Sequence, residues 1–203
     1  MIQRLAKRLL DIIGAGILLI LLLPVFMVVS LIIRSHGGTA IFGHKRVGRA
    51  GQPFVCYKFR TMIPNADQRL KELLAHDPAA REEWERDFKL KDDPRITPIG
   101  AILRQTSLDE LPQLWNVLIG DMSLVGPRPI VEAEMPRYGA DIDLYLSVRP
   151  GLTGLWQVSG RNNMSYTERV ALDSYYVNNW SLFGDIKIIF KTALVVVRGD
   201  GAY

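Results

Sequence analysis

Hydrophobic and polar positions divide the chain into an apolar start and a mixed remainder. Residues 12–33 form a run of 22 residues in which Ser30 is the only polar side chain. As a helix this run would be about 33 Å long, close to the hydrocarbon thickness of a bilayer. It is too long for the apolar part of a signal peptide, and no small-residue cleavage site follows it. The pattern predicts a membrane segment over residues 1–35, with a buried core helix as the alternative.

Charges and a proline bear on how this segment sits. Basic residues lie on both sides of the run, with Arg4, Lys7 and Arg8 before it and Arg34, His36, Lys45, Arg46 and Arg49 after it. Positive flanks favour the cytoplasm for both ends. Pro24, near the middle of the run, removes one helix hydrogen bond and can bend the helix. We therefore expect a re-entrant helix that enters and leaves on the same side, with a straight span kinked at Pro24 as the alternative.

A change to period-two alternation predicts a small β-hairpin. Residues 40–47 and 52–59 have the pattern of strands, and residues 48–51 have the composition of a hairpin loop. In the second strand Cys56, Lys58 and Arg60 share one face. Two cations on one face can bind a phosphate; the alternative is a solvated face.

Helical patterns account for much of the rest. Residues 65–90 are typical of a charged surface helix, and residues 101–104 of a short one. Ser107 and Glu110 have the spacing of a capping box, which predicts a helix through Trp115 to about Ile119, closed by Gly120. The fold class expected is α+β and mostly helical.

The C-terminal third contains two further helical patterns. Residues 126–129, Gly-Pro-Arg-Pro, form a rigid non-helical stretch, and residues 149–163 a glycine-rich loop or short-strand region. Ser165 and Glu168 form a second capping box for a helix toward Trp180. In the last helix, residues 185–198, one apolar face consists of Ile186, Ile189, Phe190, Ala193, Leu194 and Val197, with Lys187, Lys191 and Arg198 along its edge. Such a face suits a helix in a membrane interface, and packing on the core is the alternative.

Composition limits the chemistry. The net charge of +4 suits phosphate-rich partners, but no recognition helix, zinc finger or basic–aromatic stripe points to nucleic acid. The single cysteine, Cys56, excludes an internal disulfide and thiolate metal sites. No phosphate-binding glycine loop, zinc-protease or serine-hydrolase motif is present. The chemistry must therefore come from acidic and basic side chains, to which a hard metal ion such as Mg²⁺ can be added.

Asp109 and Glu110 are the most suggestive pair. Adjacent acids in a first helical turn also occur simply because they stabilise the helix. A catalytic role for this pair is favoured by several arginines near turns or prolines, namely Arg95, Arg104, Arg128 and Arg149. Arginine forks bind phosphate bidentately, so the set predicts a diphosphate site with Mg²⁺ bridging acid and phosphate.

Several motifs together resemble a known family. They are Lys58-Phe-Arg-Thr-Met62, Asp93-Pro-Arg-Ile-Thr97, Ser107-Leu-Asp-Glu-Leu-Pro-Gln113, Gly126-Pro-Arg-Pro129 and the segment from Arg149 to Arg161. In this order they resemble the bacterial sugar transferases, the monotopic phosphoglycosyl transferases, over nearly the whole chain to Tyr203. The C-terminal half is most similar to exopolysaccharide-initiating members that use UDP-galactose or UDP-glucose. The chain is similar to the short form, without extra N-terminal membrane helices.

The resemblance implies a reaction. Asp109 would attack the β-phosphate of a UDP-sugar and release UMP, and polyprenyl (undecaprenyl) phosphate would then accept the phosphosugar. Glu110, with Asp109, would hold Mg²⁺, and Arg128 would bind phosphate. Lys58 and Arg104 would line the site. One departure is Leu23 before Pro24, where some relatives have serine, so the sharpness of the bend is open.

The resemblance also implies a location and partners. The enzyme would lie at the bacterial inner membrane in contact with its lipids, with residues 36–203 as a cytoplasmic catalytic domain; a homodimer is compatible with the sequence. One alternative function is a nucleotide-sugar glycosyltransferase that releases UDP and uses Asp141 and Asp143 as a D-x-D metal site. The other is a non-enzymatic membrane scaffold.

Overall fold

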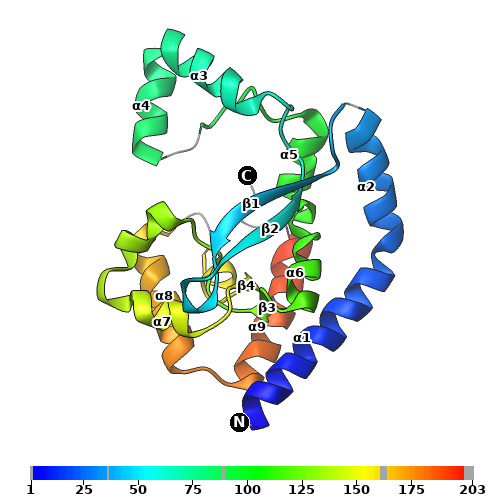
Figure 1. Ribbon diagram of the computed structural model, residues 1–203, viewed down its shortest axis with the longest axis vertical. Helices are drawn as coiled ribbons and strands as arrows, with labels where there is room; N and C mark the ends of the chain where they lie inside the picture. Colours follow the sequence, from blue (N-terminus) through cyan, green and yellow to red (C-terminus); the bar gives the residue numbers. More distant parts are fainter. Residues whose placement is uncertain (1, 36, 88–89, 161–163, 199–203) are drawn as a thin grey trace.

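The computed structural model describes residues 2–35, 37–87, 90–160 and 164–198. Figure 1 shows a bent pair of helices, α1 and α2, along one side of the molecule and a β-hairpin across its middle. Two further helices, α3 and α4, form an arm that extends away from the body and is called the helical arm. The fold is α+β and mostly helical, as predicted. The described residues form two two-stranded sheets rather than the hairpin alone.

The elements follow one another along the chain with 3₁₀ turns (η) between the helices and strands. Their order is α1 (Ile2–Leu21), α2 (Leu23–Ser35), β1 (Ile41–Val47), η1 (Arg49–Gly51), β2 (Pro53–Phe59), α3 (Ala66–His76), α4 (Pro78–Asp87), α5 (Pro98–Gln105), η2 (Leu108–Glu110), α6 (Gln113–Ile119), β3 (Ser123–Val125), η3 (Glu132–Asp141), α7 (Ile142–Ser147), β4 (Gly151–Thr153), η4 (Trp156–Val158), α8 (Tyr166–Asn178) and α9 (Leu182–Arg198).

The apolar N-terminal run forms two helices with a sharp bend between them. α1 and α2 meet at Leu22 with a bend of 61°. Pro24 lies in the first turn of α2, where its missing N–H leaves a carbonyl of α1 without its usual partner. The predicted break near Pro24 is confirmed. Among the described residues no single helix is long and apolar enough to cross a membrane; α1 and α2 meet that requirement only as a bent pair.

Polar contacts fix the first half of α1 to the body of the protein. Lys7 Nζ lies 2.6 Å from Asp185 Oδ2 on α9, and Arg8 donates to the carbonyls of Val117 and Leu118 at the end of α6. Asp11 is buried and accepts from the Ser123 hydroxyl. Two of the basic residues that flank the apolar run therefore have partners inside the protein, which counting charges did not predict.

The hairpin forms where period-two alternation predicts it. β1 and β2 pair antiparallel from Ile41 with Phe59 to Val47 with Pro53. The second edge of β2 is covered by a side chain, since the buried amide of Asn116 accepts from Tyr57 N and donates to Val55 O. Asn116 thus replaces a neighbouring strand and attaches α6 to the hairpin.

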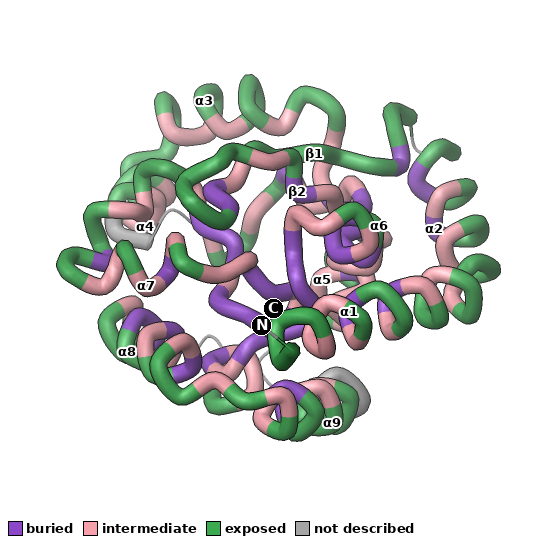
Figure 2. The backbone as a smooth tube through the Cα atoms, turned by 60° about the horizontal axis from the view of Figure 1, so that its bottom comes forward, coloured by how far each residue is buried: buried purple, intermediate pink, exposed green. Residues whose placement is uncertain are grey.

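A second, parallel pair of strands lies beneath α6. β3 and β4 pair with Ser123 opposite Gly151 and Val125 opposite Thr153. Each strand has only three residues, too short for a periodic pattern, and the sequence predicted only a loop or short-strand region here. The pair lies in the central core with Leu114, Val117 and Met122, which are fully buried. Figure 2 shows buried backbone at the centre of the molecule, near α6 and β2.

Two helix predictions have wrong boundaries because of prolines. The expected single helix over residues 65–90 is two helices, α3 and α4, because Pro78 cannot continue a helix and starts a new one after Asp77. The short helix expected at residues 101–104 begins earlier, at Pro98. Thr97 caps it by accepting from Gly100 N.

The last two helices test the remaining patterns. The Ser165–Glu168 capping box is confirmed, with both reciprocal hydrogen bonds present at the start of α8. α9 begins at Leu182 rather than Asp185, and its buried side includes Asp185 and Ile188. Much of the predicted apolar face points outward, with Ile186, Phe190 and Leu194 exposed, whereas Ile189 packs against the central core. The side chains of Val197 and Arg198 lie outside the described residues.

Candidate active site

One lysine and two acids meet where the hairpin contacts η2. Lys58, on β2, places its ammonium 2.6 Å from Glu110 Oε1 and 3.6 Å from Asp109 Oδ2. Asp109 is buried, whereas Lys58 and Glu110 are half-buried. The structure therefore brings together Lys58, Asp109 and Glu110, three of the residues that the sequence pointed to. Lys58 and Glu110 are 52 positions apart in the chain.

The local fold around the acids differs from the predicted capping box. Ser107 lies in the left-handed region, with φ of 57°, and its side chain makes no capping bond. Glu110 binds Lys58 instead of reaching back to Ser107. The α-helix begins only at Gln113, because Pro112 has no N–H and the residues before it form the 3₁₀ turn η2. The predicted closure of this helix by Gly120 is confirmed.

Burial and charge act in opposite directions on the acid–lysine cluster. Burial raises the pKa of Asp109, while Lys58 and Arg104 lower it and Glu110 raises it, with a net rise above the ordinary value. For Lys58, burial would lower the pKa, but the carboxylates of Glu110 and Asp109 outweigh it and raise the pKa. Lys58 is therefore protonated at neutral pH, and its positive charge stabilises the ionised form of the buried Asp109 carboxylate.

Arg104 is held beside the acids by the chain that follows β2. Its Nε donates to the Thr61 hydroxyl at 3.0 Å, and its positive charge is among those that lower the pKa of Asp109. Thr61 is buried, and its carbonyl accepts from Thr97 N, so the end of β2 and the start of α5 are joined. Arg104 thus acts on the site from α5, whereas Lys58 approaches it from β2.

Arg95 is bound by the nearby Asp93, whose role as its partner was not predicted from the sequence. Its guanidinium makes two hydrogen bonds to the Asp93 carboxylate, at 2.8 and 2.7 Å. Burial would raise the pKa of Asp93, but these bonds outweigh it and lower the pKa. Arg95 also lies over the Trp84 ring, which connects the helical arm to this segment. A phosphate would have to compete with Asp93 for this arginine.

Arg128 approaches the cluster from the opposite half of the chain. The stretch Gly126–Pro129 follows β3 directly and is non-helical, as predicted. The charge of Arg128 is among those that act on Lys58, and its guanidinium carbon lies 5.7 Å from the centre of the Trp156 ring. Lys58, Asp109, Glu110, Arg104 and Arg128 therefore form one electrostatic cluster, which we call the acid–base cluster.

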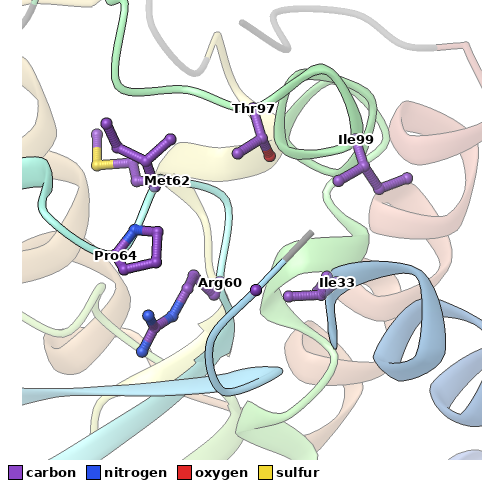
Figure 3. A pocket seen from close by; sticks show the side chains of 8 residues that line it. Ile33, Arg60, Met62, Pro64, Thr97 and Ile99 are labelled. Carbon is purple, nitrogen blue, oxygen red and sulfur yellow. The ribbon is translucent and has the colours of Figure 1, made fainter. Parts of the chain in front are cut away.

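Arg60 does not join this cluster. Its guanidinium donates to the Thr39 hydroxyl at 2.6 Å, because the strand ends at Phe59 and the chain turns. Arg60 lines a separate small pocket near the end of α2. Figure 3 shows it there with Ile33, Met62, Pro64, Thr97 and Ile99.

Arg149 lies at the far end of α6. Its Nε donates to the carbonyl of Gly120 at 2.6 Å, and the charges of Arg8 and Arg49 act on it. Arg149 and Arg8 therefore bind the final carbonyls of α6, a place that suits cations. Arg161, in the same predicted motif, lies outside the described residues.

A magnesium ion would find few protein ligands here. Among the described residues no three His, Cys, Asp or Glu side chains lie close enough together to hold a metal. Asp109 and Glu110 supply carboxylate oxygens, which Mg²⁺ prefers, and this ion commonly takes one or two carboxylates together with water and substrate phosphates. The pair fits an ion that is completed by a diphosphate.

Sequence reasoning missed Thr61, Asp93 and Trp156 as contributors. Each of the three residues lies in a motif that was identified in the sequence. The partner of Thr61 or Trp156 is distant in sequence, and the partner of Asp93, Arg95, was predicted to bind phosphate. Asp93 is separated from Arg95 by one proline, and this spacing is the one local signal that could have identified it. Thr61 and Trp156 depend on contacts across 43 and 28 positions, with Arg104 and Arg128 respectively.

Comparison with known proteins adds independent information. A family model described as bacterial sugar transferase matches residues 2–199. An undecaprenyl-phosphate galactose phosphotransferase of Salmonella typhimurium is 60% identical over 99% of this chain. The chain spans 42% of the length of that protein.

Two other relatives are shorter proteins. The exopolysaccharide production protein ExoY of Sinorhizobium fredii is 51% identical over 98% of this chain, which covers 88% of its length. A UDP-glucose:undecaprenyl-phosphate glucose-1-phosphate transferase of Caulobacter vibrioides is 40% identical over 98% of this chain, which covers 72% of its length.

Proposed function

The chain belongs to the bacterial sugar transferase family, and from that premise we propose that it transfers a sugar 1-phosphate from a UDP-sugar to undecaprenyl phosphate and releases UMP. The observation that carries this proposal is the buried Asp109 carboxylate beside the Lys58–Glu110 ion pair. The names of the relatives support UDP-galactose or UDP-glucose as the donor. The product would begin an exopolysaccharide or related glycoconjugate.

The first half-reaction is a displacement at the β-phosphorus. An Asp109 oxygen forms a bond to this phosphorus, the bond to the bridging oxygen breaks, and UMP leaves with that oxygen. A carboxylate can act as a covalent nucleophile in this way. Lys58 opposes the rise that burial causes in the pKa of Asp109, and the charges of Arg104 and Arg128, which act on this cluster, can neutralise the diphosphate.

The second half-reaction returns the enzyme to its starting state. A phosphate oxygen of undecaprenyl phosphate attacks the same phosphorus, and the bond to Asp109 breaks. The lipid diphosphate-sugar leaves, and the Asp109 carboxylate is regenerated. Mg²⁺ held by Glu110 and Asp109 would supply charge neutralisation for the transferring phosphate.

The released nucleotide tests the proposed function. We expect the purified protein, given UDP-galactose or UDP-glucose with Mg²⁺ and undecaprenyl phosphate, to release UMP and form a lipid-linked diphosphate sugar. Chromatography of the nucleotides would separate UMP from UDP. Release of UDP would instead support the glycosyltransferase alternative, in which Asp141, at the end of η3, and Asp143, exposed on α7, would be the metal ligands. No turnover with any UDP-sugar would support a scaffold.

We also propose that α1, α2 and α9 place the site at the cytoplasmic face of the bacterial inner membrane. The bent pair and the exposed apolar face of α9, with Phe183, Ile186 and Phe190, support this placement. Cysteine at position 3 and at position 71, both exposed, should be protected from an impermeant thiol reagent in intact cells and labelled after permeabilisation.

The native cysteine serves as the internal control in this experiment. Cys56 is buried, and burial raises the pKa of its thiol to about 11, so the parent chain should stay unlabelled. Labelling of position 3 but not position 71 in intact cells would show that α1 and α2 span the membrane and would contradict a re-entrant arrangement.

A further inference from the structure

Parallel pairing of β3 and β4 brings Arg128 and Trp156 together. Val125 lies opposite Thr153. Arg128 follows Val125 by three residues, and Trp156 follows Thr153 by three residues. Gly126 N donates to Thr153 O at 2.9 Å. A Cβ at Gly154 would lie 2.2 Å from Gly126 O, so the two segments approach as closely as glycine allows. Equal offsets from a parallel register therefore place the two residues side by side.

Arg128 contacts the indole ring of Trp156. The guanidinium carbon lies 5.7 Å from the ring centre. Among the described residues the Arg128 side chain has no hydrogen bond or ion pair. A carboxylate partner would occupy the guanidinium donors and neutralise the charge, whereas an aromatic face holds the cation and leaves its N–H groups free for phosphate.

Trp156 is itself held by a buried charged network. Arg169, buried on α8, lies 5.2 Å from the centre of the same ring. Its guanidinium is near Glu134 at 3.8 Å and Asp173 at 3.9 Å. Asp173 in turn accepts from the Tyr138 hydroxyl at 2.8 Å. The ring therefore contacts two arginines: the buried Arg169, which has acidic neighbours, and Arg128, which has no hydrogen bond or ion pair among the described residues.

We propose that Trp156 is a positioning residue, which holds the Arg128 guanidinium toward the transferring diphosphate. This inference rests on the proposed function. The charge of Arg128 acts on Lys58, so the guanidinium that contacts Trp156 also acts on the other members of the acid–base cluster. Without the indole, the long arginine side chain would sample many rotamers, and binding a phosphate would have to restrict them.

A double-mutant cycle tests this role. Trp156→Leu should lower kcat/KM for the UDP-sugar roughly 3- to 30-fold, the range of a cation–π contact. Trp156→Phe, which keeps an aromatic face, should recover most of that loss. The indole N–H of Trp156 has no partner among the described residues, so phenylalanine removes no hydrogen bond there. In the Arg128→Ala background, both changes at position 156 should have no further effect, within about twofold.

Controls separate positioning from folding. Trp115→Leu, at an exposed position of α6, should leave kcat/KM unchanged, and thermal unfolding should show that each variant is folded. Equal losses from Trp156→Leu with and without Arg128 would overturn the inference, as would full activity of Trp156→Leu. If that variant does not fold, Trp156→Phe decides: near-parent kcat/KM supports the aromatic contact, and a loss of the same size with and without Arg128 overturns the inference. Absence of UMP release by the parent enzyme would instead overturn the proposed function, and this inference with it.

Discussion

Replacing Asp109 by asparagine should abolish UMP release, with a loss of at least about 10³-fold in kcat. The amide keeps the shape of the side chain but cannot form the bond to phosphorus. The parent enzyme, incubated with UDP-sugar and Mg²⁺ before any lipid acceptor is added, should gain the mass of one phosphosugar on the peptide that contains Asp109. Intact-protein mass spectrometry and peptide mapping would measure both effects.

The fold should survive this change, because the Lys58–Glu110 ion pair at 2.6 Å remains. A thermal unfolding midpoint close to that of the parent would show this. Asp143→Asn, at an exposed position of α7, is the matched control and should keep full activity. An adduct on another residue, or UMP formed only after acceptor is added, would contradict a covalent Asp109 intermediate while leaving the overall reaction intact.

Local patterns predicted the elements whose determinants are close in sequence. The hairpin follows from alternation and a glycine-containing loop, and α8 from the reciprocal bonds of Ser165 and Glu168. The same spacing failed at Ser107 because Glu110 has a stronger partner, the Lys58 ammonium, which approaches from β2. A capping pattern cannot show that a distant cation competes for its acid.

Residue type predicted which side chains could bind phosphate, but not the direction in which each one points. Lys58, Arg104 and Arg128 converge on Asp109 and Glu110 because Thr61 joins the end of β2 to α5, and Asn116 joins β2 to α6, which β3 follows. Arg149, chosen for the same reason, binds the end of α6 instead. The parallel register of β3 and β4 decides which arginine reaches the site, and three-residue strands leave no periodic signal.

Replacing Lys58 by methionine should lower kcat/KM roughly 10²-fold near neutral pH and move the acid side of the pH profile to higher pH. Asp109 must be ionised to attack, so the rate rises with pH through the apparent pKa of the coupled acids. Burial raises the pKa of Asp109, and Lys58 is the first of the charges that oppose this rise. Methionine fills similar space without the charge, so the pKa should rise further and more of the enzyme should be protonated at any given acidic pH.

Two variants show whether charge at this position is responsible. Lys58→Arg keeps a cation beside the carboxylates, so its acid limb should stay close to that of the parent even where its geometry lowers the rate. Lys45→Met removes the same charge from an exposed position on β1 and should change neither the rate nor the profile. The profiles should be measured at constant ionic strength and constant Mg²⁺. If Lys58→Met lowers the rate equally at every pH, Lys58 does not control the ionisation of Asp109, and its contribution is confined to contacts with Glu110 or the substrate.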